Sequence, residues 1–504
     1  MAEATLVGVG GRKITVPTGL FIDNSFTEAS LGKTIDLENP ASGAFLATVA
    51  AAQAEDVDRA VASSAAAFAS KWRFDAPIKS RELLSKLADL IERDAEDLAS
   101  LEALDAGMLY RESLGLSVTQ SAETCRYYAG WVGKLDGRSM SIAQGMAYTR
   151  RQPFGVCAAI VPWNAPLMIT LWKLAPAVAA GNTIIIKTPE AAPLYGQKLA
   201  QLIKEAGFPP GVINILCGLG PVAGQALADH PLVRKISFTG SGGVGRRILE
   251  SSARGNMKRV TVELGGKGPS IVFADAEWEN ALLHTTMGIT AHNGQICAAG
   301  SRIYVQDEIY DRFIAEFSAR TRESVIGDPL LDSTTKGPLV NAAQKSRVRG
   351  YIQTALKEGN RLLHGGDGQD TEQPSDSSST KDGHFVPNTA FVDVPPTATI
   401  MREEIFGPVA SIARFKSEEE AIALANDSSL GLSAAVFTND ISRAIRVSDA
   451  IECGQVTVNM WGAVNVNTPF GGFKESGMGR DLGKEAMEEW TEIKSVKLNI
   501  LHKL

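Results

Sequence analysis

The segment VCAAIVPWNAPLMITLWKLAPAVAAGNTIIIK, residues 156–187, combines two short apolar runs with a longer apolar run between them. Residues 156–161 and 183–187 predict strands, and residues 171–180 predict a helix. The alternation continues, with strands expected at 212–216 and 235–238 and helices at 195–206 and 222–228. Strands that alternate with helices imply a parallel sheet covered by helices on both faces.

A second series of the same kind begins near residue 270. Strands are expected at 270–273 and 303–305, and helices at 310–325 and 346–358. Apolar stripes predict further helical stretches at 56–72 and 79–104. A chain of 504 residues has room for two or three domains. We therefore predict an α/β protein with two Rossmann-like parallel-sheet domains that join near residue 265.

The composition limits the class of function. The chain is 44% hydrophobic and 21% charged, with a net charge of −7, which argues against a nucleic-acid partner. Five cysteines without a CxxC pair indicate neither a disulfide framework nor a zinc site. The six histidines have no metal-ligand spacing, so no metal is expected. A reducing compartment, the cytoplasm, is the expected location.

Signals for other locations are weak. The first residues lack the charged start and apolar run of a secretory signal. The final HKL, residues 502–504, resembles a peroxisomal address without its usual small residue, so the peroxisome is the alternative location. Residues 152–172 carry no charge, but Pro153, Pro162 and Pro166 would break a spanning helix, so no membrane partner is expected. The hydrophilic stretch 365–383 predicts a mobile surface loop.

A glycine-rich turn follows the strand expected at 235–238. Residues 240–245, GSGGVG, match the G-x-G-x-x-G pattern and lead into a helix-like run at 244–252. Backbone amides at such a helix start can receive a diphosphate, which would make Gly240, Ser241 and Gly245 part of a dinucleotide site. A plain turn between strand and helix is the alternative.

Two acidic residues are candidates for holding a ribose of the dinucleotide. Spacing from the glycine-rich turn indicates Glu263. Glu190, in the block KTPE at 187–190, also follows a strand and leaves Glu263 available for chemistry. A carboxylate at the ribose repels a 2′-phosphate, so we expect NAD to be preferred. The neighbouring Lys187 keeps NADP as a secondary cofactor.

Two short motifs indicate covalent catalysis. Cys297 lies in GQICA, residues 294–298, among small neighbours, and Glu263 ends the apolar run VTVEL. A thiol nucleophile and a carboxylate that activates water form a catalytic pair. Asn164, in the rigid loop PWNAP, supplies an amide donor suited to an oxyanion. Each of these residues also has an alternative role. Cys297 could be an inert buried thiol or could pair with His292, and Asn164 could be a turn residue. We assign the role of inert buried thiol to the other cysteines, Cys125, Cys157, Cys217 and Cys453.

Seven blocks stand in an order and spacing that resemble one family over nearly the whole chain. They are RQPFGVCAAIVPWNAPL (151–167), KTPE (187–190), FTGSGGVG (238–245), ELGGKGP (263–269), GQIC (294–297), EEIFGPV (403–409) and PFGGFKESGMGRDLG (469–483). The chain resembles the NAD(P)-dependent aldehyde dehydrogenase superfamily, in its hydrolytic, non-acylating branch. Its 34-residue step from Glu263 to Cys297 is also similar to the family's spacing between base and nucleophile.

The resemblance implies a mechanism. Cys297 would attack an aldehyde to form a thiohemiacetal whose oxyanion is held by Asn164 and the Cys297 backbone N–H. Loss of hydride would leave a thioester, and Glu263 would activate the water that hydrolyses it. By similarity, the residues expected to contact the cofactor are Trp163, Lys187, Glu190, Gly240, Ser241, Gly245, Leu264, Glu404 and Phe406.

The resemblance also implies a substrate pocket and an assembly. The pocket would draw on Met168, Ile169, Trp172, Ile296, Ala298, Trp461 and Phe470, an apolar set that favours uncharged aldehydes. By the same analogy, residues 1–134 and 154–265 form an NAD-binding domain and residues 266–480 a catalytic domain. A small β element from 135–153 and 481–504 would join protomers into a homodimer or homotetramer.

Two rival classes stay open. A binding or structural relative could use the same fold without activity. Such a protein would usually lack the nucleophile or the base, whereas Cys297, Glu263 and Asn164 are all present. A CoA-acylating enzyme would transfer the thioester to CoA instead of water, and it commonly lacks the glutamate at position 263.

Overall fold

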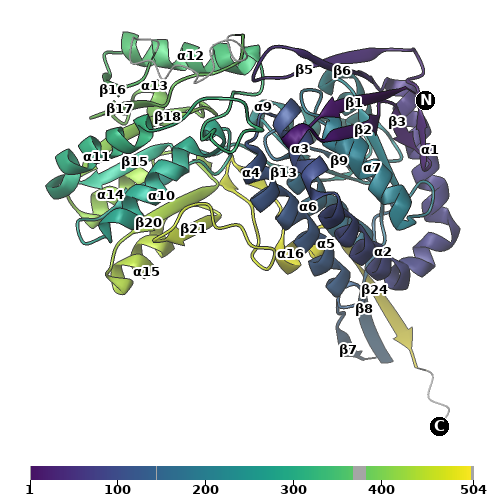
Figure 1. Ribbon diagram of the computed structural model, residues 1–504. Helices are drawn as coiled ribbons and strands as arrows, with labels where there is room; N and C mark the ends of the chain where they lie inside the picture. The colour runs from purple at the N-terminus through teal and green to yellow at the C-terminus, as the bar shows by residue number, and fades with distance from the viewer. Residues whose placement is uncertain (1, 144, 367–381, 501–504) are drawn as a thin grey trace.

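The computed structural model describes residues 2–143, 145–366 and 382–500, and it places two α/β lobes side by side (Figure 1). Each lobe is built on one large sheet, and a third, three-stranded sheet projects from the first lobe. Most of the loop predicted at 365–383, and the HKL end, lie outside the described residues. The fold class expected from the alternating pattern is confirmed.

The first lobe, lobe 1, contains an eight-stranded sheet in the order β23-β13-β12-β9-β10-β11-β3-β4. Its five central strands run parallel and are β9 (Val156–Ile160), β10 (Thr183–Thr188), β11 (Ile213–Cys217), β12 (Lys235–Thr239) and β13 (Arg259–Glu263). The antiparallel edge strands are β3 (Leu20–Ile22), β4 (Ser25–Thr27) and β23 (Gly477–Met478). The carboxyl ends of the central strands therefore meet along one edge of the sheet.

Successive residues of each central strand face opposite sides, and both sides are covered. Cys157 and Ala159 of β9 pack among the helices α2 (Arg73–Arg93), α5 (Thr119–Trp131), α6 (Pro166–Ala179) and α7 (Leu194–Ala206). Ala158 and Ile160 pack among α1 (Ala54–Ala67), α8 (Gln225–Asp229) and α9 (Gly242–Arg254). This two-sided burial explains why the strands are almost continuously apolar in sequence.

The second lobe, lobe 2, is built on a seven-stranded sheet in the order β16-β17-β18-β15-β14-β20-β21. Its strands are β14 (Pro269–Val272), β15 (Arg302–Gln306), β16 (Arg361–His364), β17 (Thr389–Val392), β18 (Val409–Phe415), β20 (Ser433–Phe437) and β21 (Gln455–Val458). One face carries α10 (Trp278–Thr290) and α11 (Tyr310–Arg322). The other carries α12 (Ala342–Lys357), α13 (Thr399–Arg402), α14 (Glu418–Asn426) and α15 (Ile441–Ala450).

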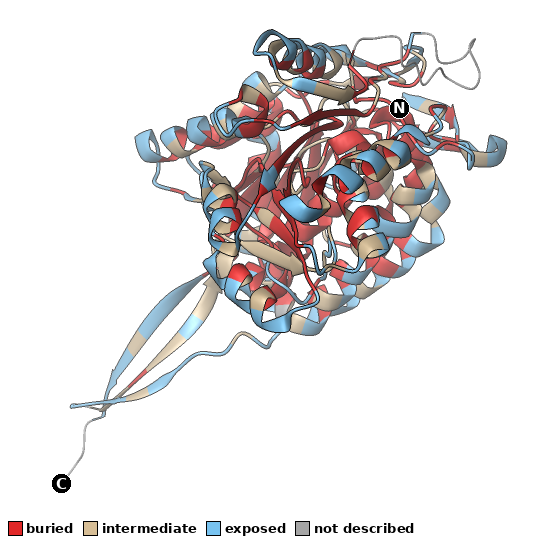
Figure 2. Ribbon diagram, turned by 90° about the vertical axis from the view of Figure 1, so that its left-hand side faces the viewer, coloured by how far each residue is buried: buried red, intermediate tan, exposed pale blue. Residues whose placement is uncertain are grey.

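The three-stranded sheet forms an arm that leaves the body of the molecule, with much of its surface exposed (Figure 2). It contains β7 (Ser139–Ile142), β8 (Gly145–Pro153) and β24 (Thr491–Asn499), all antiparallel. β24 begins directly after α16 (Gly483–Glu489) and Trp490, whose side chain is buried in the lobe 1 core. The arm is therefore fixed at its base and free along its length.

Short elements complete the chain. Besides β3 and β4, two further hairpins precede α1, formed by β1 (Glu3–Val7) with β2 (Lys13–Pro17) and by β5 (Thr34–Glu38) with β6 (Phe45–Ala50). β19 (Leu430–Gly431) pairs with β22 (Phe473–Lys474). The remaining helices are α3 (Ala95–Asp105) and α4 (Tyr110–Glu112). Among the helices within the described ranges, none is long and apolar enough to cross a membrane.

Candidate active site

The site lies where the two sheets approach each other. The carboxyl ends of β9, β12 and β13 supply Trp163–Asn164, Gly240–Ser241 and Glu263 from lobe 1. In lobe 2, Cys297 precedes β15 and Phe406 precedes β18, and these two strands are parallel neighbours. Loops before adjacent parallel strands lie at the same sheet edge, so the fold brings both residues toward the strand ends of lobe 1.

A cavity of about 210 Å³ joins these loops. Of the residues expected from the sequence, its walls contain Trp163, Asn164, Gly240, Ser241, Glu263, Leu264, Cys297, Glu404 and Phe406. The fold therefore gathers all three residues expected to be catalytic in one place. Its walls also contain Pro162, Thr239, Gly265, Gln344 and Arg347, to which the sequence analysis assigned no role in a site.

Cys297 sits in a partly exposed loop after a left-handed turn. Burial raises the pKa of its thiol to about 12, and the carboxyl groups of Glu404 and Glu263 add to the rise. The backbone carbonyl of Cys297 lies so close to Gly266 that a Cβ there would come within 2.3 Å of it, so the loop needs glycine at 266.

Glu263 ends β13 with its side chain buried. Neither carboxylate oxygen has a hydrogen-bond partner among the described residues. Burial raises the pKa of Glu263 well above its ordinary value, and the charge of Asp481 adds to the rise. Asp481 itself forms a buried ion pair with Lys173, with the two charged groups 2.8 Å apart. A buried carboxyl group without partners and with a raised pKa has the properties of a general base.

Asn164 is also buried, and its side-chain Nδ2 donates a hydrogen bond to the Gln295 carbonyl at 2.8 Å. An amide nitrogen carries two hydrogens, so this bond leaves the second one available. Asn164 thus differs from an ordinary turn residue, because it bridges to the loop that carries Cys297.

The glycine-rich turn opens the 13-residue helix α9. Ser241 is the N-cap, and no side chain of the described residues caps the first turn. The first backbone N–H groups of α9 are therefore available to an anion. A Cβ at Gly245 would come within 2.7 Å of Leu264 Cδ2, so glycine lets the helix pack closely on the strand end.

Glu404 and Phe406 form the opposite wall. Glu404 Oε1 accepts a hydrogen bond from the Gly266 backbone N–H at 2.9 Å, and burial raises the pKa of Glu404. Phe406 adopts a positive φ of 61° and meets the Trp163 ring edge-on, with centroids 5.4 Å apart. A bulky residue in the left-handed region is strained, so the surrounding contacts hold this loop in place.

Lys187 and Glu190 do not line this cavity. Lys187 lies in β10, near its carboxyl end, and Glu190 follows the strand. The two side chains pair at 2.6 Å, and Glu190 Oε1 accepts from the Gly220 backbone N–H at 3.2 Å. Burial alone would raise the pKa of Glu190, but the charge and hydrogen bond of Lys187 hold it below its ordinary value. The Lys187 carbonyl accepts from the Val161 N–H, so the pair lies beside the loop that carries Trp163.

The residues expected to form the substrate pocket do not line this cavity. Cys297 and Ala298 pack against an apolar cluster that includes Met168, Ile169, Trp172 and Phe470. The rings of Trp172 and Phe470 are 5.0 Å apart, and Trp461 Nε1 donates to the Ala298 carbonyl at 2.9 Å. Ile296, beside Cys297, is half-buried.

The missed residues Gln344 and Arg347 belong to the first turns of α12. Gln344 Nε2 donates to the Phe406 carbonyl at 2.8 Å, and Arg347 donates to the Glu404 carbonyl at 2.9 Å. The sequence predicted this helix from 346, four residues too late. Asn341 followed by Gln344 is a helix-capping signature that could have revealed the true start.

The cysteine assignments need one correction. Cys125, Cys157 and Cys217 are buried as expected, but Cys453 is only half-buried. It follows α15 in a short turn before β21, where the apolar surroundings are incomplete.

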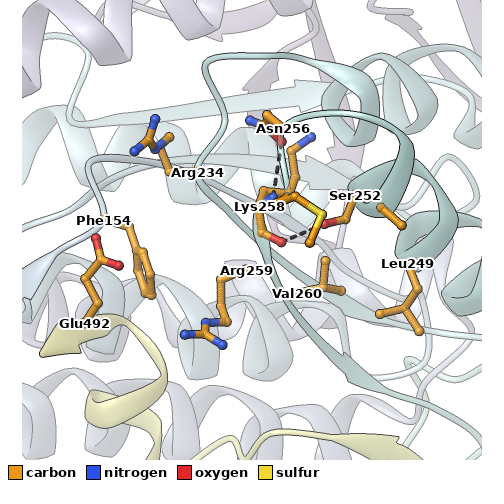
Figure 3. A pocket seen from close by; sticks show the side chains of 11 residues that line it. Phe154, Arg234, Leu249, Ser252, Asn256, Lys258, Arg259, Val260 and Glu492 are labelled. Atoms are coloured by element: carbon orange, nitrogen blue, oxygen red, sulfur yellow. Dashed lines mark hydrogen bonds between the residues drawn. The ribbon is translucent and has the colours of Figure 1, made fainter.

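A larger cavity, of about 530 Å³, lies away from this site. Figure 3 shows it beside Phe154, Arg234, Arg259 and Glu492, close to the base of the arm. Among the described residues that line it, none is expected to be functional, and none is a cysteine that could act as a nucleophile. The larger cavity therefore lacks the chemistry that the smaller one assembles.

The chain is similar to known proteins over nearly its whole length. The profile described as "Aldehyde dehydrogenase family" matches residues 26–496. An "Aldehyde dehydrogenase" from Aspergillus niger is 45% identical over 494 residues, which cover 98% of this chain and 97% of that protein. The crystal structure of a putative aldehyde dehydrogenase from Burkholderia cenocepacia is 42% identical, with a TM-score of 0.93 over 97% of this chain and 99% of that one. The NAD+ complex of a Bacillus cereus aldehyde dehydrogenase is 41% identical, with a TM-score of 0.92 over 96% and 97% of the two chains.

Proposed function

This chain belongs to the aldehyde dehydrogenase family, and from that premise we propose that it oxidises uncharged aldehydes to carboxylic acids with NAD as cofactor. The observation that carries the proposal is the single cavity lined by Cys297, Glu263 and Asn164 beside the turn at Gly240–Ser241. That cavity holds a nucleophile, a base, an amide donor and an anion-binding helix start, which are the groups the reaction needs.

Groups of lobe 1, in the cavity and beside it, support binding of a dinucleotide. The uncapped start of α9 suits a diphosphate, and the ionised Glu190 beside Lys187 suits ribose hydroxyls. Glu404, across the cavity, would hold the second ribose, and Leu264 and Phe406 would flank the ring. When bound there, NAD supplies the acceptor for the hydride that leaves the substrate carbon.

Cys297 begins the reaction in this proposal. Its sulfur attacks the aldehyde carbon, the carbon–sulfur bond forms as the π bond of the carbonyl breaks, and the thiol proton passes to solvent water. The second Nδ2 hydrogen of Asn164 and the Cys297 backbone N–H hold the oxygen as its negative charge develops. Loss of hydride from the same carbon converts the thiohemiacetal into a thioester on Cys297.

Glu263 completes the cycle. It takes a proton from a water molecule, and the oxygen of that water attacks the thioester carbon. The carbon–sulfur bond then breaks, and the proton held by Glu263 passes to the departing sulfur. The carboxylic acid leaves, and the Cys297 thiol and the Glu263 carboxylate are restored. The raised pKa of Glu263 supports this role, because a carboxylate with a raised pKa is a stronger base than an exposed one.

The direct experiment is an aldehyde panel with NAD. Uncharged aliphatic and aromatic aldehydes are expected to give NADH absorbance together with an equal amount of acid. The apolar cluster of Met168, Ile169, Trp172 and Phe470 supports this choice over dicarboxylic semialdehydes. Acyl-CoA formed in the presence of CoA would indicate the acylating reaction instead. Binding of NAD without turnover of any aldehyde would indicate a non-catalytic relative.

Cofactor choice gives a second prediction. NAD is expected to have a kcat/KM about tenfold or more above that of NADP, because the Glu190 carboxylate would repel a 2′-phosphate. Glu190→Gln removes this charge and is expected to lower the ratio of kcat/KM with NAD to kcat/KM with NADP severalfold. Glu205→Gln, an exposed carboxylate at the other end of α7, is the matched control and is expected to leave the ratio unchanged. Higher kcat/KM with NADP in the unmodified enzyme would overturn the assignment.

Assembly and domain roles form part of the same proposal. We assign NAD binding to residues 1–134 and 154–265, catalysis to 266–480, and contacts between protomers to 135–153 and 481–504. The arm supports a homodimer or homotetramer, because it exposes Ile142, Ile493 and Leu498 to solvent. Light scattering on the purified enzyme would test this, and a monomer would contradict it. The five free thiols support a cytoplasmic location.

A further inference from the structure

The loop before Cys297 adopts an unusual conformation. His292, Asn293 and Gly294 have φ values of 43°, 55° and 66°, so three consecutive residues are left-handed. Two of them carry side chains, for which this conformation is unfavourable. A Cβ at Gly294 would come within 2.3 Å of the Gly407 carbonyl, so the loop presses directly on the segment that carries Phe406. Such a turn persists only where its surroundings hold it.

Gln295 makes the contacts that hold it. Its side chain is fully buried, and Oε1 accepts from the Val340 backbone N–H at 3.0 Å. Its Nε2 donates to the His292 carbonyl at 3.2 Å, and its own backbone N–H donates to the same oxygen at 3.1 Å. The amide therefore closes the left-handed turn and ties it to the segment before α12.

The backbone of Gln295 also orients the oxyanion donor. Its carbonyl oxygen can only accept, so it selects the NH₂ end of the Asn164 amide at 2.8 Å. The second Nδ2 hydrogen then has a defined direction. A shift of the Gln295 backbone would move this hydrogen, although no atom of Gln295 lines the cavity.

Val340 connects the same residue to the opposite wall. Val340 precedes Asn341, the N-cap of α12, and the first turns of α12 hold the Glu404 and Phe406 carbonyls. A path of hydrogen bonds, joined by the backbone between Val340 and the start of α12, thus runs from Asn164 through Gln295 to the loop at 404–406.

We propose that Gln295 is a positioning residue that sets the Asn164 donor in register with Cys297 and anchors both to the start of α12. The inference rests on the proposed function, since it assigns Gln295 a part in aldehyde oxidation. Gln295 touches no reacting atom in this role and acts through Asn164.

The first test is Gln295→Met, which keeps the side chain's length and removes both amide bonds. We expect kcat to fall about 10- to 100-fold, because small displacements of a catalytic donor cost that much. The Kd of NAD, measured by quenching of tryptophan fluorescence, is expected to change less than threefold. Unchanged kcat in a folded variant would overturn the proposal.

A double-mutant cycle separates positioning from general damage. Asn164→Ala is expected to lower kcat about 10²- to 10³-fold by removing one oxyanion donor. If Gln295 acts through Asn164, adding Gln295→Met to that variant costs less than a further threefold. Losses that multiply would show that Gln295 acts independently of Asn164 and would refute the proposal.

Rescue and control variants keep the test informative if the methionine variant folds poorly. Gln295→Glu retains the acceptor for the Val340 N–H, and its protonated form can still donate to the His292 carbonyl. Because this donor is lost on ionisation, the kcat of the variant, divided by that of the unmodified enzyme, is expected to fall as pH rises. A pH-independent ratio to the unmodified enzyme would contradict the donor role. Gln306→Met removes a similar bond, to the Ala274 N–H at 2.9 Å, and is expected to be fully active.

The unmodified enzyme, assayed beside the variants, keeps this inference distinct from the proposed function. Absence of NAD-linked aldehyde oxidation there would count against the function itself. Activity there with a normal Gln295→Met variant would count against the positioning role alone.

Discussion

Replacing Cys297 by alanine is expected to lower kcat for aldehyde oxidation by about 10⁴-fold or more. Among the residues that the structure describes, Cys297 is the only thiol in the cavity walls. Cys125, Cys157 and Cys217 are buried in lobe 1, and Cys453 lies in lobe 2 away from the cavity. Without the sulfur, no thiohemiacetal forms and hydride has no route from the aldehyde carbon. NADH absorbance, followed over hours at high enzyme concentration, measures the residual rate.

The matched control is Cys453→Ala. Cys453 is the other half-buried thiol but does not line the cavity, so its removal is expected to change kcat less than twofold. Cys297→Ala is also expected to bind NAD normally by fluorescence quenching, because the contacts assigned to the cofactor stay intact. Full activity in a Cys297→Ala variant would contradict covalent catalysis at this position.

Cys297→Ser extends the same comparison. A hydroxyl keeps the shape of the side chain but is far less acidic than a thiol, and the surrounding carboxyl groups of Glu404 and Glu263 oppose any negative charge there. Serine is therefore expected to restore little of the activity lost in the alanine variant.

The fold was predictable because the decisive elements are buried on both sides. β9, β10, β11 and β12 begin within a residue of their predicted starts, since continuous apolar runs between turns leave little choice of boundary. The N-terminal hairpins were not predicted. β5 and β6 are short and largely exposed on alternate residues, so their pairing depends on contacts with distant parts of the chain.

Helix interruptions were also missed. The predicted helix at 56–72 changes to a π-helical turn at Phe68–Trp72, where Ser70 is extended. The predicted helix at 79–104 is two helices, because Asp94 leaves the helical conformation and accepts from Arg93 and Lys198. An apolar stripe continues across both breaks, so periodicity alone does not reveal them.

The position of the candidate catalytic residues was predictable from the motifs that contain them. Cys297, Glu263 and Asn164 lie in short motifs at or near the ends of strands, and the fold places all three in the walls of one cavity. Gln295, Gln344 and Arg347 act mainly through backbone carbonyls and amides of other loops. Such bonds depend on the folded path of both partners, and residue identity carries no direct signal of them.

Replacing Glu263 by glutamine is expected to divide the reaction into a fast and a slow half. The variant should release one NADH per active site in a burst, because attack by Cys297 and loss of hydride do not use Glu263. Steady-state turnover should then fall about 10²- to 10⁴-fold, since an amide cannot take the proton from water. Stopped-flow absorbance of NADH resolves the two phases, and the thioester should accumulate as an added acyl mass on the peptide that contains Cys297.

The pH dependence identifies the same carboxyl group. Because burial raises the pKa of Glu263, the protonated form persists at higher pH than in an exposed glutamate, and only the ionised form can act as a base. Thioester hydrolysis in the unmodified enzyme is therefore expected to accelerate as pH rises through this elevated pKa. The Glu263→Gln variant should lose that titration and keep only the dependence on hydroxide.

The outcome of the burst experiment distinguishes the roles that Glu263 could have. Loss of the burst together with turnover would mean that Glu263 assists Cys297 before hydride leaves. Normal turnover with normal acid release would mean that another group activates water. Glu250→Gln, an exposed change on α9, controls for the loss of one negative charge and is expected to show neither effect. A burst followed by slow hydrolysis is the result that assigns Glu263 to the second half of the reaction, because only that half consumes water.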